Sequence, residues 1–277
     1  MKILLLLSNE LKQYYLIREL SKNYKILGAV IEDKYTTFTR IKTVLKHSGA
    51  NPLKIGKVLI QKAKIREYES RDNKIIAKYF SENSQPLNVD PPIKLLRVKN
   101  INEKKSLDFI KSLFPDLIVV FGTSLVKNKI ASIPQKGIIN VHTGLSPYYR
   151  GGQCAFWCLY NDEPEYIGVT IHWLNQGIDE GDIILQGRPV IELDDNLCTI
   201  ECKLAKLAIE LLKKAISKVE KGTANRVIQR EKGRLYLSRQ FTLEKRLELE
   251  SRLAEGLIKK YLSRKDEVYD RVKIVDD

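Results

Sequence analysis

Short apolar segments alternate with amphipathic segments along most of this chain, and this rhythm constrains the fold more than any other feature. Segments such as 2–8 and 117–121 are almost wholly apolar, as expected of strands that are buried on both faces. Strands that alternate with helices form parallel sheets, so we expect an α/β fold with a mostly parallel sheet flanked by helices. The expected strands are 2–8, 25–31, 94–98, 117–121, 137–141, 166–174 and 182–192, and the expected helices are 10–22, 103–113 and 199–219.

Two polar residues, Asn140 and His142, mark the end of the expected strand 137–141. They are two residues apart, so on a strand both side chains point to the same face. The carboxyl end of a strand is the edge where open α/β sheets bind ligands. An amide and an imidazole that converge there can hold the oxygen of a carbonyl as it becomes an oxyanion. Asp179 lies in the turn Gly177-Ile-Asp-Glu-Gly181, where a carboxylate can keep the imidazole charged or accept a proton.

Taken alone, an Asn-x-His pair is more often part of an ordinary strand end than of an active site, but further motifs accompany this one. They are 115–120, 122–126, Leu145-Ser-Pro-Tyr-Tyr-Arg-Gly151, Gly168-Val-Thr-Ile-His172 and the turn 177–181. In this order the motifs resemble the folate-dependent formyltransferase family. That family includes methionyl-tRNA formyltransferase, glycinamide ribonucleotide formyltransferase and the sugar N-formyltransferases. The resemblance covers residues 114–215.

The resemblance implies a Rossmann-like formyltransferase fold and transfer of a formyl group from 10-formyltetrahydrofolate to a primary amine. The catalytic Asn, His and Asp of the family fall on Asn140, His142 and Asp179. The residues expected to bind the folate are Gly122, Thr123, Ser124, Leu125, Val126, Gly177 and Ile178, those expected to bind the substrate are Tyr149 and Arg150, and no metal is expected. Many members read His-Pro-Ser-Leu-Leu-Pro where this chain has His142-Thr-Gly-Leu-Ser-Pro147, so the loop that seats the acceptor departs from that pattern while the catalytic positions do not.

The members of the family differ in their acceptor, and the sequence favours a nucleotide-linked amino sugar. The pattern of residues 222–277 predicts helices rather than the C-terminal β-barrel with which methionyl-tRNA formyltransferase binds tRNA. The segment Ser8-Asn-Glu-Leu11 lacks the glycine-rich phosphate loop that glycinamide ribonucleotide formyltransferase places after its first strand, and Glu10 would repel a phosphate there. Sugar N-formyltransferases often carry the Ser-Pro-Tyr-Tyr-Arg-Gly form of the loop. The two other acceptors remain the alternatives.

Length and charge suggest how the chain is organised. We expect a catalytic domain over 1–221, a basic helical insertion at about 40–92 and a C-terminal helical extension over 222–277. Between Arg40 and Lys78 there are eleven Lys or Arg against three Asp or Glu, in a chain of net charge +14. Such a surface contacts the phosphates of a nucleic acid or of a nucleotide-linked substrate, or is only a solvated helix face. In the extension, an apolar stripe on a charged helix is expected to fold back onto the domain, with a homodimer contact as the alternative; its residues are Leu243, Leu247, Leu253, Leu257 and Tyr261.

Other classes of function fit less well. A nicotinamide-dependent oxidoreductase would need a G-x-G-x-x-G loop after a strand, and no such loop occurs. A non-catalytic RNA-binding protein on a formyltransferase core is the alternative of another class, and the presence of Asn140, His142 and Asp179 together argues against it. The apolar run 3–7 is too short for a signal peptide or a membrane span, so we expect a cytoplasmic protein that does not enter a membrane.

The remaining histidines and the cysteines are interpreted as structural. The pairs Cys154/Cys158 and Cys198/Cys202 have C-x₃-C spacing, which allows a four-thiolate metal site on helices, but cysteine is also an ordinary small buried residue. We favour the second interpretation, with reduced thiols as in the cytoplasm. His172 is expected to be part of an alternating strand and His47 part of the basic segment.

Overall fold

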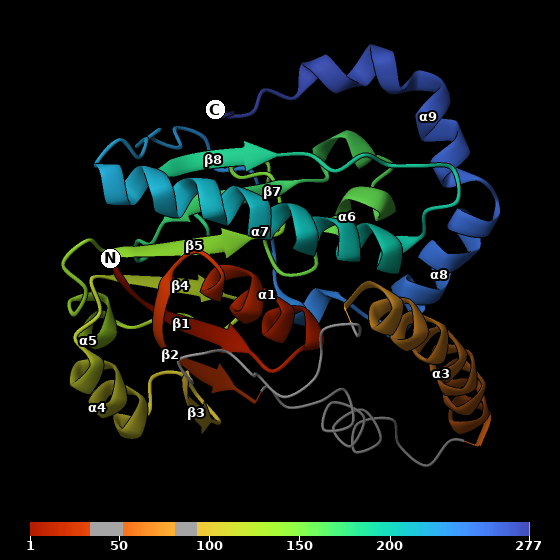
Figure 1. The fold of residues 1–277 in the computed structure, drawn as a ribbon. Coiled ribbons are helices and arrows are strands. Elements are labelled where there is room, and N and C mark those ends of the chain that lie inside the picture. Colours follow the sequence, from red (N-terminus) through yellow and green to blue (C-terminus); the bar gives the residue numbers. More distant parts are fainter. Residues whose placement is uncertain (34–51, 81–92, 277) are drawn as a thin grey trace.

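The computed structural model describes residues 1–33, 52–80 and 93–276, and its centre is a seven-stranded sheet (Figure 1). The strand order is β3-β2-β1-β4-β5-β7-β8. The first five of these strands are parallel, whereas β7 is antiparallel to both of its neighbours. The strands are β1 (Lys2–Ser8), β2 (Lys25–Glu32), β3 (Lys94–Val98), β4 (Leu117–Phe121), β5 (Ile138–His142), β7 (Val169–Trp173) and β8 (Ile183–Gly187). The expected mostly parallel sheet is confirmed.

Helices cover both faces of this sheet, α1 and α7 on one face and α4 and α5 on the other (Figure 1). Side chains alternate along β1, so that Leu5 and Leu7 pack toward α1 and α7 while Leu4 and Leu6 pack toward α4 and α5. The helices are α1 (Leu11–Ser21), α3 (Pro52–Phe80), α4 (Lys104–Leu113), α5 (Asn128–Ala131), α6 (Cys154–Tyr160), α7 (Leu197–Lys221), α8 (Leu243–Ala254) and α9 (Leu257–Val268), with short 3₁₀ helices η2 (Pro164–Tyr166), η3 (Ser238–Gln240) and η4 (Tyr269–Arg271). No helix in the described ranges is long and apolar enough to cross a membrane.

The expected elements occur close to their expected places, and local chemistry sets their ends. Helix α7 begins at Asn196, whose side chain accepts hydrogen bonds from the backbone N–H groups of Cys198 and Thr199. The last expected strand, 182–192, is shorter than expected, because β8 ends at Gly187. Pro189 follows two residues later and has no N–H group to continue the ladder.

The C-terminal extension differs from the single helix that the sequence suggested. It forms two helices, α8 and α9, which are separated at Gly256. That glycine has a φ of 95°, a left-handed conformation that disfavours a side chain. The stripe contains a spacing of six residues, which does not keep a helical face. The buried apolar residue of α8 is Leu249 instead. The extension folds back onto the core through Leu249, Leu257 and Tyr261.

A short second sheet lies between the loop after β5 and the extension. Strand β6 (Tyr149–Gly151) pairs in parallel with β9 (Arg234–Tyr236). The sequence analysis predicted neither strand, because three residues carry too little periodicity to stand out.

The basic insertion and the extension are held together by a cluster of charges. On α3, Arg71 donates from both terminal nitrogens to the Glu250 carboxylate of α8, at 3.0 and 3.1 Å. Arg246 of α8 donates to Asp72 of α3 at 2.9 Å and also pairs with Glu250. Residues 40–51, including His47, and the expected loop 81–92 lie outside the described residues.

The open edge of the sheet at β8 is covered by the chain itself. Val227 forms an antiparallel bridge with Ile183 of β8. Further along the strand, the backbone N–H of Gln186 donates to the carbonyl of Val275. Two segments of the extension therefore occupy backbone groups that an edge strand would otherwise leave unpaired.

We expect Glu250→Ala to lower the free energy of unfolding by about 1.5 kcal/mol, because hydrogen bonds to charged groups contribute about 1.5–3 kcal/mol and Arg71 is partly solvated. Urea unfolding at neutral pH measures the loss. Glu255→Ala, an exposed position in the same extension, serves as the control and should change stability by less than about 0.5 kcal/mol. Equal losses in the two variants would contradict a role for the Arg71–Glu250 pair.

Candidate active site

Four polar side chains meet at the carboxyl end of β5. Asn140 and His142 extend from β5, and the antiparallel register of β5 and β7 places His172 directly opposite Asn140. The loop after β7 brings in Asp179. Its Oδ1 lies 3.3 Å from Asn140 Nδ2, and its Oδ2 lies 3.4 Å from His142 Nδ1. The fold therefore brings the three catalytic residues expected from the sequence into contact.

Asp179 is held in place by its backbone as well as by its partners. Its φ of 52° is left-handed, a conformation that non-glycine residues adopt only where the surroundings impose it. The backbone N–H of Gly151 donates to Oδ2 at 2.8 Å. Burial favours a raised pKa, but the nearby His142 and His172 rings and the Gly151 N–H outweigh it and hold the pKa of Asp179 well below its ordinary value. Asp179 is therefore ionised at neutral pH.

The ring of His142 lies in a tight, mostly buried position. Its Nε2 is 2.9 Å from the carbonyl oxygen of Tyr149, which can only accept, so Nε2 carries a hydrogen. The Sγ atom of Cys154, at the start of α6, lies 3.6 Å from the same nitrogen. A Cβ atom at Gly144 would lie 2.4 Å from His142 Nε2, so this position requires glycine.

His172 is a residue of the site that the sequence analysis missed. Its Nδ1 is 2.8 Å from the carbonyl oxygen of Trp173, so Nδ1 carries a hydrogen. Nε2 lies 3.0 Å from Asn140 Nδ2 and 3.5 Å from Asp179 Oδ1. The interpretation of His172 as an ordinary strand residue is therefore incomplete. The sequence places it on an alternating strand, but only the direction of β7 reveals that it lies beside Asn140.

Asn140 uses both hydrogens of its amide nitrogen within the site. One faces Nε2 of His172 and the other faces the ionised Asp179 carboxylate. Exchanging the amide oxygen and nitrogen would set oxygen against carboxylate, so this orientation is the favourable one. Asn140 can donate to an oxyanion only after one of these two contacts breaks. The contact with Asp179 is the longer of the two.

The loop expected to bind the folate follows β4 and is held by the side chain of Glu32. Glu32, at the end of β2, is buried and accepts from the backbone N–H of Ser124 at 2.7 Å and of Ile101 at 2.8 Å. Thr123 bonds within the loop, Leu125 is exposed, and Val126 packs on the core near α4 and α5. Gly122 has a φ of 77°, and Gly177 and Ile178 lie in the separate loop that carries Asp179.

Tyr149 and Arg150, the residues expected to bind the substrate, are both buried and bonded within the protein. The Tyr149 hydroxyl bonds to Glu163, and Asn161 donates to it at 2.9 Å. Arg150 pairs with Glu180 and donates to the carbonyl of Gly233 at 3.3 Å. These contacts fix the loop around β6, and a direct contact with substrate remains a prediction for both residues.

Comparison with known proteins agrees with this geometry. The family model described as formyl transferase matches residues 26–216, which is more than half of the chain. The chain belongs to the formyl transferase family. This membership confirms the resemblance that the motifs suggested.

The proteins that this chain resembles are named for different formyl acceptors. Methionyl-tRNA formyltransferase of Clostridioides difficile is 38% identical over 151 residues, which cover 50% of this chain and 48% of that protein. A sugar N-formyltransferase from Shewanella has a TM-score of 0.55 at 17% identity, with 87% of this chain and 78% of that chain covered. An N-formyltransferase from Helicobacter canadensis, solved with folinic acid and dTDP-3-aminofucose, has a TM-score of 0.53 at 14% identity and covers 87% and 73%. The chain spans about half the length of the curated relatives it matches.

The four cysteines of the chain lie in two places. Cys154 and Cys158 are buried in α6, and Cys198 and Cys202 lie on α7. Burial raises the pKa of the Cys154 thiol, which keeps it protonated beside His142. Within residues 1–33, 52–80 and 93–276, no group of His, Cys, Asp and Glu side chains has an arrangement that could hold a metal ion.

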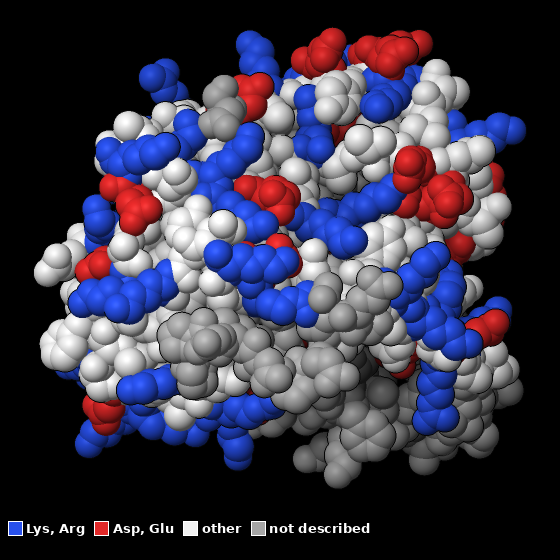
Figure 2. Space-filling model, in the orientation of Figure 1, with Lys and Arg blue, Asp and Glu red and all other residues white. Residues whose placement is uncertain are grey.

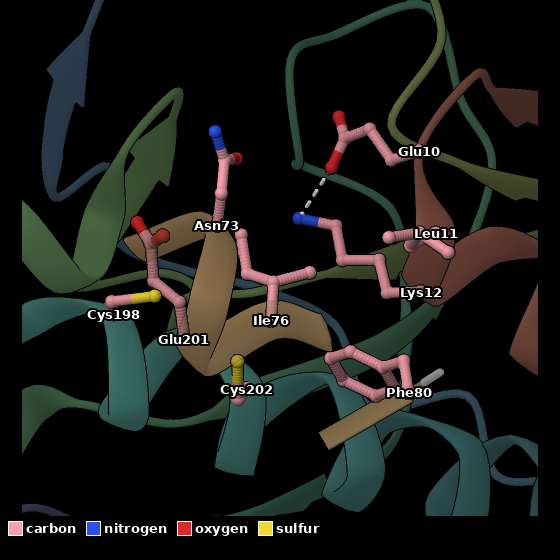
Figure 3. A pocket seen from close by; sticks show the side chains of 9 residues that line it. All are labelled: Glu10, Leu11, Lys12, Asn73, Ile76, Phe80, Cys198, Glu201 and Cys202. Atoms are coloured by element: carbon pink, nitrogen blue, oxygen red, sulfur yellow. Dashed lines mark ion pairs between the residues drawn. The ribbon is translucent and has the colours of Figure 1, made fainter. Parts of the chain in front are cut away.

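A cavity of about 230 Å³ lies between the start of α1, the end of α3 and the start of α7 (Figure 3). Phe80 and Ile76 line its apolar part, and Asn73 and Glu201 line its polar part. Lys12 also lines the cavity and pairs with Glu10 at 2.7 Å. Burial raises the pKa of the Glu201 carboxyl, although Lys12 opposes the shift. No sequence motif pointed to this cavity, because its residues come from three separate helices.

Replacing any one residue of the triad Asn140, His142 and Asp179 should abolish most turnover without unfolding the protein. We expect Asn140→Ala, His142→Ala and Asp179→Asn each to lower the rate of formyl transfer by roughly 10² or more, because each loses an interaction made in the transition state. Single-turnover assays measure the rate, and circular dichroism checks the fold. Near-wild-type turnover of His142→Ala would remove the mechanism proposed below.

Asp179 should also make stability depend on pH. Because its folded pKa lies below its ordinary value of 3.8, the stabilisation that it contributes is complete above that pH and is lost as the pH falls through the folded pKa. The difference in unfolding free energy between wild type and Asp179→Asn should therefore shrink between about pH 4 and pH 2. Urea unfolding across this range measures it, and a difference that is independent of pH would contradict the shift.

Proposed function

We propose that this formyl transferase moves a formyl group from 10-formyltetrahydrofolate to a primary amine. The observation that carries the proposal is the contact of Asp179 with both Asn140 and His142 at the carboxyl end of β5. Two donors and one ionised carboxylate at a single point are what acyl transfer to an amine requires. The formyl transferase membership of residues 26–216, which includes all three residues, supports the same chemistry.

The side chains divide the reaction between them. As the amine nitrogen bonds to the formyl carbon, His142 and Asn140 donate to the oxygen that becomes an oxyanion. Asn140 does so by giving up its 3.3 Å contact with Asp179. Asp179, kept ionised by its low pKa, accepts the proton that leaves the amine nitrogen. The bond from the formyl carbon to N10 of the folate would then break, and N10 would keep the electron pair and take the proton that Asp179 accepted, which returns Asp179 to its carboxylate form. No covalent enzyme intermediate is needed.

We place the folate between the loop Gly122–Val126 and the loop that carries Gly177 and Ile178. The first loop leaves β4 at the carboxyl edge of the parallel strands, beside the end of β5. The second loop leaves the antiparallel β7 at the opposite edge and returns to bring Asp179 into contact with Asn140 and His142. Backbone groups of the first loop are held in position by Glu32, so they are ready to bond a flat polar ring. The neighbour from Helicobacter canadensis, solved with folinic acid, supports a folate as donor.

The acceptor that we propose is a nucleotide-linked amino sugar. The cavity in Figure 3 begins where β1 ends, and β4 alone separates β1 from β5 in the sheet. Strands are about 4.8 Å apart, so the cavity edge and the triad are separated by roughly 10 Å at the level of the sheet. Carboxylate and amide groups such as Glu201 and Asn73 suit the hydroxyls of a nucleoside, as acidic residues do in nucleotide-binding folds. The neighbour solved with dTDP-3-aminofucose fits this class of acceptor.

Methionyl-tRNA is the second candidate, because the sequence relatives carry that name. Lys and Arg side chains are spread across the face formed by α1 and α7, with Asp and Glu between them (Figure 2). A basic surface of this kind favours contact with a polyanion. The charge of this surface does not distinguish a tRNA from a nucleotide, so an assay with both acceptors has to distinguish them.

A panel of acceptors tests the proposal. Amino-sugar nucleotides, glycinamide ribonucleotide and methionyl-tRNA are each incubated with 10-formyltetrahydrofolate, and mass spectrometry identifies the formylated product. We expect an amino-sugar nucleotide to react, and His142→Ala, as the catalytic control, to leave it unmodified. Formylation of methionyl-tRNA alone, with an affinity that falls steeply with salt, would decide for the second candidate. No product from any amine would overturn formyl transfer to these classes.

A variant of a cavity residue tests, in the same assay, whether the cavity binds the acceptor. Glu201→Gln should raise the KM for the sugar nucleotide about tenfold and change kcat little, because the nucleoside loses a hydrogen bond to a carboxyl group that is far from the reacting atoms. Glu210→Gln, on the same helix but outside the cavity, is the matched control. Equal KM values for both variants would exclude the cavity as part of the acceptor site.

A further inference from the structure

Residues 227–236, in the C-terminal extension, lie against both loops that bring polar groups to the triad. Val227 forms a bridge with β8, Gln229 contacts the loop that carries Asp179, and β9 pairs with β6. This segment follows residues 26–216, which match the formyl transferase family. Its contacts with the triad therefore come from outside the part of the chain that the family model matches.

The side chain of Gln229 holds the backbone on both sides of Glu180. Its Nε2 donates to the carbonyl oxygen of Asp179 at 3.0 Å and to that of Gly181 at 2.7 Å. Exchanging the amide nitrogen and oxygen would set oxygen against two carbonyl oxygens, so the orientation with nitrogen toward the carbonyls is the favourable one. Both hydrogens of the amide nitrogen are thus used at one turn of the chain.

The loop that Gln229 contacts needs such support. It consists of residues 174–182, between β7 and β8, with bends in place of regular structure. Asp179 has a φ of 52°, a conformation that costs energy for a non-glycine residue and persists only where the surroundings impose it. The two hydrogen bonds from Gln229 fix the peptide group that follows Asp179 and the one that follows Gly181. They therefore restrain the backbone from which the carboxylate extends.

The carboxylate of Asp179 is held from the other side by a group that the same segment positions. The backbone N–H of Gly151, on β6, donates to Oδ2 at 2.8 Å. Strand β6 is itself paired with β9, in a register that sets Gly151 opposite Tyr236. The segment thus holds the backbone of Asp179 through Gln229 and its side chain through Gly151.

We propose that Gln229 is a positioning residue that fixes the Asp179 carboxylate against the other two residues of the triad. It acts through the backbone of Asp179 and does not touch the reacting atoms. This inference rests on the proposed function, because the position of the carboxylate affects the rate only if Asp179 accepts the proton in the reaction. A misplaced base slows the chemical step and leaves substrate binding nearly unchanged, so Gln229 acts on kcat rather than on KM.

Hydrogen exchange of the Gly151 amide, measured by NMR, tests the positioning without any substrate. Gln229→Met keeps the length of the side chain and removes both N–H donors. We expect the exchange rate of Gly151, divided by that of Val119 in the buried strand β4, to rise about tenfold, because the N–H is released whenever Asp179 moves away. A general loss of stability would speed both amides and leave the ratio unchanged. Arg230→Met, at the exposed neighbouring position, is the matched control and should keep the ratio within about twofold of the wild type.

The kinetic test uses 10-formyltetrahydrofolate and the acceptor that the panel identifies. Gln229→Met should lower kcat about tenfold and change the KM of the acceptor by less than about twofold. In an Asp179→Asn background the same substitution should cause no further loss, because the base that Gln229 positions is already gone. Arg230→Met should leave both constants within about twofold of the wild type.

The outcomes separate this inference from the proposed function. An unchanged exchange ratio in Gln229→Met would overturn the positioning role, and so would an equal loss of kcat in the wild-type and Asp179→Asn backgrounds. Equal effects of Gln229→Met and Arg230→Met would overturn it as well. If no acceptor gives a product, the proposed function fails, while the exchange ratio still decides whether Gln229 holds Asp179.

Discussion

The carboxylate of Asp179 is the interaction on which the site depends. It contacts Asn140 and His142 on β5, and it accepts from the N–H of Gly151, so it joins the end of one strand to two loops. These contacts keep it ionised despite burial, and they explain why a non-glycine residue is held in a left-handed conformation there. The same contacts occupy the donors that the reaction needs. The unliganded site is therefore satisfied internally, and substrate must compete with Asp179 for Asn140.

The sequence allowed prediction of the sheet and the three central side chains, but not of their immediate surroundings. All-apolar runs such as 117–121 are unambiguous, and an Asn-x-His spacing fixes a shared face whatever the neighbours are. His172 was not predicted to be a site residue, because its place beside Asn140 depends on the antiparallel direction of β7, which no local pattern encodes. For Arg150, the motif gave no sign of the pairing with Glu180, thirty residues away in sequence. Contacts between distant segments are what local periodicity leaves undetermined.

The insertion and the extension act as one structural unit at the edge of the sheet. Arg71 and Asp72 of α3 bind Glu250 and Arg246 of α8, although the two helices are far apart in sequence. Helix α3 also supplies Phe80, Ile76 and Asn73 to the cavity near α7. Helix α3 thus contacts both the extension and the cavity.

The covering of β8 by Val227 and Val275 affects how readily the protein aggregates in a crowded cell. An uncovered edge strand offers its backbone groups to any other extended chain and is a starting point for aggregation. Here residues near the end of the sequence complete the hydrogen bonding of a strand formed much earlier. During synthesis on the ribosome, β8 emerges well before its cover does. Until Val227 and Val275 have been made, the nascent chain therefore exposes an edge strand that can pair with another chain, and in this interval a chaperone would be of most use.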